Sequence, residues 1–148
     1  MLIDAARTAD IPALCTLLAS LFSQEAEFSP DSRAQQAGLK LIIENPEIGT
    51  ILVARHGGQL VGMLNLLFTV STALGGRVAL LEDMVIAAAH RGTGIGTLLM
   101  GKALDFARQN SCQRITLLTD ADNASAQRFY QRQGFNLSPM IAFRRHLA

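Results

Sequence analysis

The chain has 148 residues, about half of them apolar, and its 13 basic and 12 acidic side chains leave a formal net charge of +1. This length suits one domain with a sizeable core, so we expect residues 1–148 to form a single domain. No stretch concentrates Lys or Arg, and Trp is absent. The sequence therefore lacks the basic face and the stacking aromatics of nucleic-acid-binding proteins, and we expect no nucleic-acid partner.

The sequence carries no sign of export or membrane insertion. Its opening stretch, MLIDAARTAD, contains two acids and no long apolar run, unlike a signal peptide. The longest nearly apolar run, LVGMLNLLFTV, has 11 residues and is too short to cross a bilayer. Cys15 and Cys112 show no spacing typical of a metal site or a redox pair. We expect a cytoplasmic protein without a bound metal and without a membrane partner.

The first half of the chain predicts a strand, two helices and a hairpin. LIDAA reads as a short strand, and the apolar residues after it recur at helical spacing. SPDS begins a second helix, which ends before Pro46. TILVARHGGQLVGMLNLLFTV then predicts two strands around a Gly57–Gly58 turn.

The second half predicts a strand, a glycine-rich loop and helices between further strands. In chain order these are the strand VALLEDMVI, a helix to about Asn110, the strand RITLLT, the helix NASAQRFYQRQ and the strand MIAFRRHL. Asn123 is a good cap for the last helix, and Gly134 ends it. This mixed order does not fit a doubly wound parallel sheet; it predicts one mixed sheet with helices on both faces.

The run HRGTGIGTLLMG has three glycines at alternate positions, Gly92, Gly94 and Gly96. A merely structural helix entry is disfavoured, because each Gly costs up to ~1 kcal/mol relative to Ala inside a helix. Closely spaced glycines instead allow a tight turn and the near approach of a ligand to the backbone.

Two nucleotide-binding patterns come close to this run, and both fail. GTLLMGKA differs from the P-loop at Ala103, which has no hydroxyl for Mg²⁺. The dinucleotide fingerprint needs G-x-G-x-x-G directly after a strand, whereas here the spacing is G-x-G-x-G and AAAH intervenes. The remaining interpretation is a pyrophosphate at a helix N-terminus, held by loop amides, the helix dipole and Arg91.

Two motifs resemble the GNAT superfamily of N-acetyltransferases, which bind acetyl-coenzyme A. RGTGIG matches the family's R-x-x-G-x-G/A signature, and LLEDMVI resembles the strand before it. DNASAQRFYQRQGF resembles the later helix and turn, N-x-x-A-x-x-F-Y-x-x-x-G-F. The resemblance implies an α/β fold with a mixed, mostly antiparallel sheet of about seven strands and helices on both faces. It also implies acetyl-CoA as co-substrate, no metal, and a homodimer.

Acetyl transfer to an amine first requires a neutral amine, and Glu82 and Asp83 are the candidate acids. A lysine-like ammonium has a pKa near ~10.4, so only about one part in a thousand is neutral at pH 7. A carboxylate can remove that proton, directly or through water. Strand alternation sends the two acids to opposite faces. The resemblance makes Glu82 the base and gives Asp83 the role of contacting or orienting the amine, and either acid can instead face solvent.

The family stabilises the oxyanion with a backbone N–H of the central strand, here near Val85. The same strand binds the pantetheine arm through the backbone of Met84–Ile86, where it splays from RITLLT. The resemblance therefore implies a cofactor site made of Met84, Val85, Ile86, Arg91, Gly92, Thr93, Gly94, Ile95, Gly96, Thr97, Asn123 and Tyr130.

Tyr130, the only tyrosine, is the candidate acid for the departing thiolate. A phenol with a pKa near ~10 keeps its proton at pH 7 and can give it to a thiolate whose own pKa is near ~8.5. Asn123 lies two helical turns earlier on the same face, so it can reach the same cofactor. The alternative for Tyr130 is an ordinary half-buried aromatic that packs beside Phe129 and Phe135.

The acceptor is the least defined part of the sequence. The LED acids resemble the branch of the family that acetylates polyamines and related small amino compounds. Glu25 and Glu27 fall between the first two helices, a region that often lines the family's acceptor site, and with Asp83 they can attract a cationic amine. A solvated loop is the alternative for these two. Acetylation of a protein N-terminus or lysine, and a non-catalytic acyl-CoA sensor, also stay open.

Overall fold

The computed structural model of the chain describes residues 1–22 and 31–148. Its elements in chain order are β1 (Leu2–Ala5), η1 (Thr8–Asp10), α1 (Ile11–Phe22), α2 (Ser32–Glu44), β2 (Gly49–His56), β3 (Gln59–Ser71), β4 (Gly76–Ile86), η2 (Ala88–His90), α3 (Ile95–Gln109), β5 (Ile115–Leu117) and α4 (Ala124–Arg132). The predicted helices and the hairpin are thus confirmed. Asp31 caps α2 by accepting hydrogen bonds from the backbone N–H groups of Arg33 and Ala34, at 3.1 and 3.2 Å.

The described strands form one sheet in the order β1-β2-β3-β4-β5. The first four pair antiparallel and only β4 and β5 pair parallel, so the sheet is mixed and mostly antiparallel as expected. It has five strands among the described residues, rather than about seven. RITLLT contributes three residues to β5 instead of a full-length strand.

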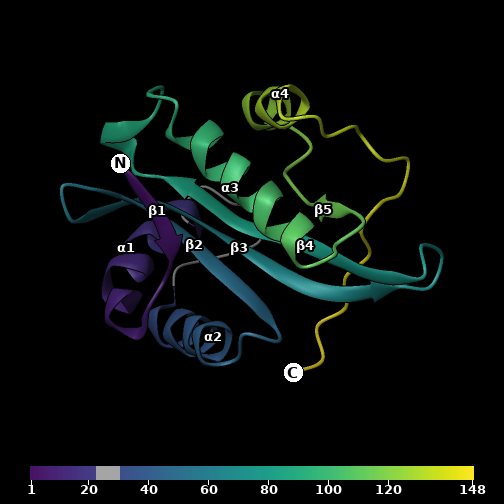
Figure 1. Cartoon of the computed structure of the whole chain (residues 1–148), viewed down its shortest axis with the longest axis horizontal. Helices are drawn as coiled ribbons and strands as arrows, with labels where there is room; N and C mark the ends of the chain where they lie inside the picture. Colours follow the sequence, from purple (N-terminus) through teal and green to yellow (C-terminus); the bar gives the residue numbers. More distant parts are fainter. Residues whose placement is uncertain (23–30) are drawn as a thin grey trace.

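Helices cover the sheet on both faces, and each face has its own core. Figure 1 shows α3 and α4 on one side of the strands and α1 and α2 on the other. On the α3 face, Leu64, Leu66 and Leu81 pack against Leu99 and other apolar residues of α3. The opposite core, on the α1/α2 face, consists of Leu14, Leu17, Leu18, Leu39, Ile51, Val53, Met63 and Val85.

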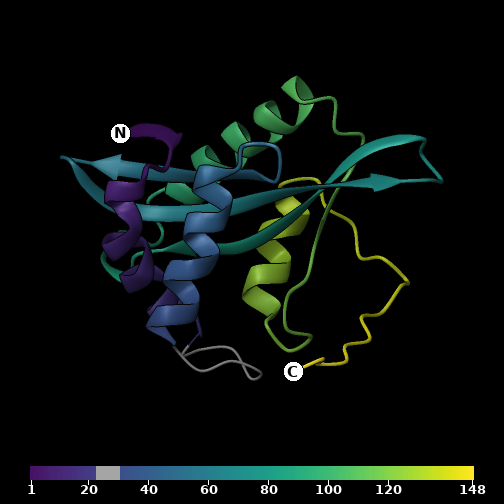
Figure 2. The ribbon, with the colours of Figure 1, turned by 90° about the horizontal axis from the view of Figure 1, so that it is seen from below.

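The end of the chain departs from the prediction. Gly134, at φ +94°, ends α4, and the Phe135 N–H donates to the Tyr130 carbonyl at 3.0 Å. Beyond it, MIAFRRHL forms no strand, so that prediction is wrong for the described chain. Figure 2 shows the yellow C-terminal segment as a coil apart from the strands, and a strand forms only beside another strand's edge. Its large apolar side chains are at least 80% exposed: Leu137, Met140, Ile141, Phe143 and Leu147.

An ion-pair cluster joins η1 to the edge of the sheet. The Arg55 guanidinium on β2 donates to both carboxylate oxygens of Asp10, at 2.8 and 2.7 Å, and to Asp4 on β1 at 2.9 Å. Arg55 and Asp10 are 12% and 11% exposed, so water screens the pair poorly. The hydrogen bond from Arg55 holds the pKa of Asp10 below its usual value, and Asp10 in turn raises the pKa of Arg55. The cluster fixes the start of α1 against β2.

No helix within residues 1–22 and 31–148 is long and apolar enough to cross a membrane.

Candidate active site

A bulge in β4 brings the two candidate acids to the same face. Asn65 pairs with Glu82 and Met63 with Val85, so Leu64 alone stands opposite two residues of β4, Asp83 and Met84. Asp83 has a φ of +55°, a conformation that Asp tolerates better than most residues. Because the bulge inserts one residue, Glu82 and Asp83 both line one cavity on the α1/α2 face. The expectation that alternation separates them was wrong for this reason.

Asn65 on β3 holds Asp83 in place. Its Nδ2 donates to the Asp83 carboxylate, Oδ2, at 2.7 Å. Since a carboxylate only accepts, the amide nitrogen must face Asp83, and the amide oxygen Oδ1 is left over. Asn65 is 3% exposed, and this oxygen has no hydrogen-bond partner. A buried, unpaired acceptor therefore lies beside both acids.

The cavity around these groups has a volume of about 460 Å³. Among the described residues, its apolar wall comes from α1, α2 and β3 and consists of Leu18, Phe22, Leu39, Ile42 and Leu67. Asp31, the N-cap of α2, and Gln35 within α2 add polar groups. Gln35 is 8% exposed, and its Nε2 has no hydrogen-bond partner. Glu25 and Glu27, the other predicted acceptor residues, lie outside the described residues.

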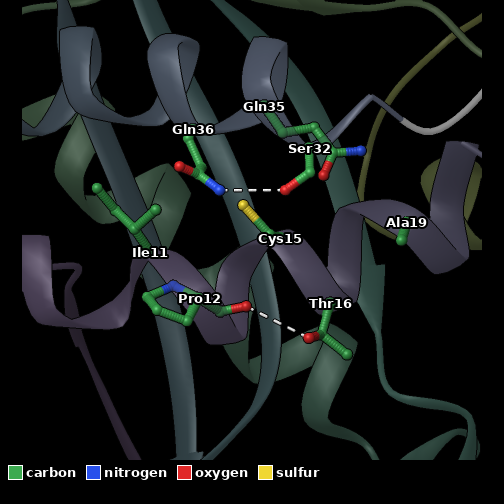
Figure 3. A pocket seen from close by; sticks show the side chains of 8 residues that line it. All are labelled: Ile11, Pro12, Cys15, Thr16, Ala19, Ser32, Gln35 and Gln36. Atoms are coloured by element: carbon green, nitrogen blue, oxygen red, sulfur yellow. Dashed lines mark hydrogen bonds between the residues drawn. The ribbon is translucent and has the colours of Figure 1, made fainter.

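A second cavity between α1 and α2 has a different chemistry. Figure 3 shows Cys15 near its centre, with Gln36 donating to the Ser32 hydroxyl at 3.1 Å and Thr16 to the Pro12 carbonyl at 3.3 Å. Its described lining holds no charged side chain, and burial raises the pKa of the Cys15 thiol. The Gln35 amide points away from Cys15 in this view. We therefore place the candidate site at the cavity that holds the acids.

The far end of β4 has an open edge. β5 pairs with β4 only as far as Leu81 and Leu117, whereas β4 continues to Ile86. The Ile86 carbonyl points to this edge, where it accepts a hydrogen bond from Arg91 Nε at 3.1 Å. Since backbone direction alternates, Met84 also faces the open edge and Val85 faces β3. The Val85 side chain is buried in the α1/α2 core.

The glycine loop adopts the conformation that its spacing predicts. Gly92 and Gly94 have φ values of +75° and +85°, which favour glycine, and no atom lies within 4 Å of a Cβ built at either position. Gly94 is the N-cap of α3 and offers no side-chain cap. The first N–H groups of α3, from Ile95, Gly96 and Thr97, have no acceptor within the helix. Thr93 Oγ1 bonds the His90 carbonyl at 2.5 Å and steadies the loop.

Gly96 has a different role from the other two glycines. A Cβ at this position would lie 3.4 Å from the Phe129 ring and 3.7 Å from the Met84 side chain. Both distances are ordinary van der Waals contacts, so a Cβ would fit here, and the first turn of α3 lies directly against α4 and β4. Gly96 is the point where the loop, the open edge and α4 meet.

The helix α4 carries Tyr130 and Asn123. Asn123 caps α4, because its side chain accepts a hydrogen bond from the Ala126 N–H at 3.1 Å. The Tyr130 ring packs edge-on against Phe129 and Phe135, with ring centres 5.5 and 6.0 Å apart. It is half-buried against the α3-face core, so the aromatic packing anticipated as its alternative role is present.

The described residues contain no group of three or more His, Cys, Asp or Glu side chains that could hold a metal ion.

Comparison with known proteins agrees with this geometry. The model of the acetyltransferase (GNAT) family matches residues 11–135. This range holds β2 to β5 and the helices on both faces of the sheet. The chain belongs to the GNAT family. It is an N-acetyltransferase, and members of this family use acetyl-CoA as co-substrate.

Relatives of this GNAT enzyme span most of its length. The uncharacterized N-acetyltransferase YhfO of Bacillus subtilis (strain 168) is 33% identical over 91% of this chain and 89% of its own. The aminoalkylphosphonate N-acetyltransferase of Salmonella typhimurium (strain LT2) is 26% identical over 90% and 83%. An aminoglycoside 6'-N-acetyltransferase from Acinetobacter haemolyticus shares the fold, with a TM-score of 0.80, 19% identity, and coverage of 100% of this chain and 99% of its own.

Sequence reasoning missed Asn65 and Gln35 in this GNAT chain. Asn65 is the only strongly polar residue in the run LVGMLNLLFTV, and a lone amide in an apolar strand was the available signal. Gln35 lies one helical turn before the buried Leu39, so the helical pattern alone would have placed it on the inner face.

Proposed function

We propose that this enzyme moves the acetyl group of acetyl-CoA to a primary amine of a small molecule by direct attack. The observation that carries the proposal is the pair of adjacent acids, Glu82 and Asp83, in a cavity beside the open edge of β4. The coenzyme would supply the acetyl group as a thioester. The glycine loop suits its pyrophosphate, because Gly92 and Gly94 leave open space before the N-terminus of α3.

Arg91 is the proposed fixed charge at this loop. Its Nε is held by the Ile86 carbonyl, which leaves the terminal nitrogens to bind phosphate oxygens. The binding set proposed with it comprises the loop and first helical turn, the open edge and α4: Gly92, Thr93, Gly94, Ile95, Gly96, Thr97, Met84, Val85, Ile86, Asn123 and Tyr130. Of the strand residues, Met84 and Ile86 would bind through the backbone, and Val85 would hold the edge in place from the core.

Glu82 is the proposed base, and Asp83 the group that orients the amine. Glu82 would take a proton from the ammonium so that the nitrogen can attack. Asp83, bonded to Asn65, keeps a fixed direction and stays an acceptor for a second N–H of the amine.

Two further groups would act on the acyl end. A backbone N–H that faces the open edge, from Met84 or Ile86, can stabilise negative charge on the acetyl oxygen. Tyr130 would give its phenolic proton to the sulfur that leaves. Glu82 would take the first proton of the ammonium. The second nitrogen proton, lost as the C–S bond breaks and the amide forms, would return to the Tyr130 phenolate, directly or through water, and so restore its phenol.

A small acceptor is favoured over a protein by the size of the cavity. A volume of about 460 Å³ falls in the range of sites that enclose small molecules. The aminoalkylphosphonate relative, by its name, acts on a small amine. Acetylation of a protein N-terminus or lysine is the second candidate, and a peptide that competes with small amines would support it.

A homodimer is proposed from the exposed C-terminal segment. Its apolar side chains, among them Ile141 and Phe143, lie in water in the single chain, and the outer edge of β5 has no strand beside it in the described part. If this segment paired with the outer edge of β5 in a second copy, the dimer would cover both the apolar side chains and the open strand edge. Light scattering should then give twice the chain mass for the parent and the chain mass for Phe143→Lys; a monomeric parent contradicts the proposal.

The activity is tested by incubation with acetyl-CoA and a panel of amines, with thiol release followed over time. Mass spectrometry of each amine should show a gain of one acetyl group. Calorimetry with coenzyme A tests the binding part separately. Binding without thiol release from any amine would refute the proposed reaction, and absence of binding would refute the proposed cofactor site.

A further inference from the structure

We infer that the acceptor is a primary amine that carries a second, uncharged oxygen acceptor, such as a hydroxyl or amide carbonyl, on a short apolar body. The inference rests on the proposed function and names the substrate class of its cavity. Two buried and unpaired polar atoms define it: Asn65 Oδ1 at one end and Gln35 Nε2 in the wall formed by α2.

The amine end is defined by three acceptor groups. Glu82 stands directly opposite Asn65 in the β3–β4 pairing, and Asn65 is bonded to Asp83. The Glu82 carboxylate, the Asp83 carboxylate and Asn65 Oδ1 are therefore neighbours on one face. A primary ammonium has three N–H donors, one for each of these acceptors. When Glu82 takes one proton, Asn65 and Asp83 keep the other two N–H groups and so orient the nitrogen lone pair.

The distal end is defined by Gln35. Its Nε2 is a donor buried beneath the surface, and a ligand that fails to supply an acceptor leaves it unpaired. Gln35 comes from α2, whereas the acids come from β4, so the ligand must span the space between helix and sheet. The wall between them is apolar, with Leu39 and Leu67 among its residues, which fits a short carbon chain.

The charges of the cavity decide what the second group is. Its described lining includes three carboxylates, from Asp31, Glu82 and Asp83, and no Lys, Arg or His. A carboxylate or phosphonate on the acceptor would meet this negative field without a cation to neutralise it. A hydroxyl or amide oxygen satisfies Gln35 without that repulsion. Gln35 is thus the residue that selects the second group.

The test compares four amines of matched length with the full chain and acetyl-CoA: 4-amino-1-butanol, n-butylamine, 4-aminobutanoate and 1,4-diaminobutane. For the parent, kcat/KM for the amino alcohol should exceed that for the alkylamine about tenfold or more, as expected when a buried polar group is otherwise left unpaired. The amino acid should be the poorest of the four.

Variants at Gln35 then separate its role from general damage. Gln35→Leu should bring the ratio of amino alcohol to alkylamine close to one, and Gln35→Glu should shift preference to the diamine, because the new carboxylate pairs with its second ammonium. The matched control is Gln36→Leu, the next residue on α2, whose amide bonds Ser32 and lines the other cavity. This variant should keep the parental ratio.

The outcomes distinguish this inference from the proposed function. A parent ratio near one, or an unchanged ratio in Gln35→Leu, overturns the inference while acetyl transfer itself stands. If no amine is acetylated, the proposed function fails, and calorimetry of each amine with the coenzyme A complex still tests the inference. Tighter binding of the amino alcohol than of the alkylamine in the parent but not in Gln35→Leu supports it, and equal binding overturns it.

Discussion

The two faces of the sheet build their halves of the site by different means. On the α3 face, the loop relies on backbone conformation: positive φ at Gly92 and Gly94, and free N–H groups at the start of a helix. On the α1/α2 face, the cavity relies on polar side chains from three elements, with Gln35 from α2, Asn65 from β3 and the acids from β4. A backbone site can be encoded in one short motif, whereas a side-chain site depends on residues that only the fold brings together.

The largest effect should come from Tyr130, which belongs to the α3 face but acts through its side chain. Tyr130→Phe keeps the ring that packs against Phe129 and Phe135 and removes the hydroxyl. We expect turnover to fall by about two to four orders of magnitude, the usual contribution of a positioned acid. Calorimetry should find acetyl-CoA binding nearly unchanged.

Stability and donor chemistry provide the controls for this variant. Thermal unfolding of Tyr130→Phe should match that of the parent; weakened folding with normal turnover would make the hydroxyl structural. A thioester whose thiol has a lower pKa needs less help from an acid, so it should rescue the variant more than the parent. Absence of rescue would leave Tyr130 a role in positioning only.

Glu82 tests the α1/α2 face, with the next largest effect. Glu82→Gln keeps the shape and removes the charge, and we expect about a hundredfold loss of kcat/KM at neutral pH. The loss should shrink as pH rises, because free amine becomes abundant without a base. Glu44→Gln, on the exposed end of α2, is the control. A pH–rate profile of Glu82→Gln that overlays the parent would refute its role as a base.

Asp10 tests how much its ion pair with Arg55, which anchors the start of α1, contributes to the stability of the fold. The pKa of Asp10 is lowered by its hydrogen bond from Arg55, so its contribution to stability is complete above the unfolded pKa near 3.8 and is lost as pH falls through the lower folded pKa. Asp10→Asn should reduce the free energy of unfolding by about 2 kcal/mol at neutral pH. The difference from the parent should narrow in acid, as urea titrations at several pH values would show. Equal differences at pH 7 and pH 2 would contradict this assignment.

The smallest effect concerns the backbone of the loop. Gly94→Val forces a branched side chain into φ +85° at the point where the proposed pyrophosphate approaches. We expect coenzyme A to bind about tenfold more weakly, a cost of about 1.4 kcal/mol, because the side chain obstructs the ligand and a free loop that relaxes from the left-handed conformation must return to it on binding. Gly101→Ala, inside the same helix at an ordinary φ, is the control and should bind normally. Unchanged affinity in a folded Gly94→Val protein would refute the loop as the site.

The same contrast explains what could be predicted from the sequence. RGTGIG and the cap at Asn123 are local signals, and the structure bears out the loop conformation and the capped helix. The bulge at Asp83 carries no such signal, because VALLEDMVI reads as an unbroken strand. Asn65 and Gln35 lie 18 and 48 positions before Asp83, and only the pairing of β3 with β4 and the packing of α2 bring them to it. MIAFRRHL has the composition of a strand, yet pairing needs a neighbouring edge that sequence cannot supply.

The bulge lets one strand hold two adjacent acids on the same face without disturbing either core. Leu81 and Met84 belong to the α3-face core, whereas Val85 belongs to the opposite core. Without Asp83, Met84 would pair with Leu64, and simple alternation would keep every remaining side chain of β4 on its present face. Asp83 is therefore equivalent to one inserted residue that leaves the facing of the other β4 side chains unchanged. A strand can acquire a second carboxylate in this way without a compensating change elsewhere in the core.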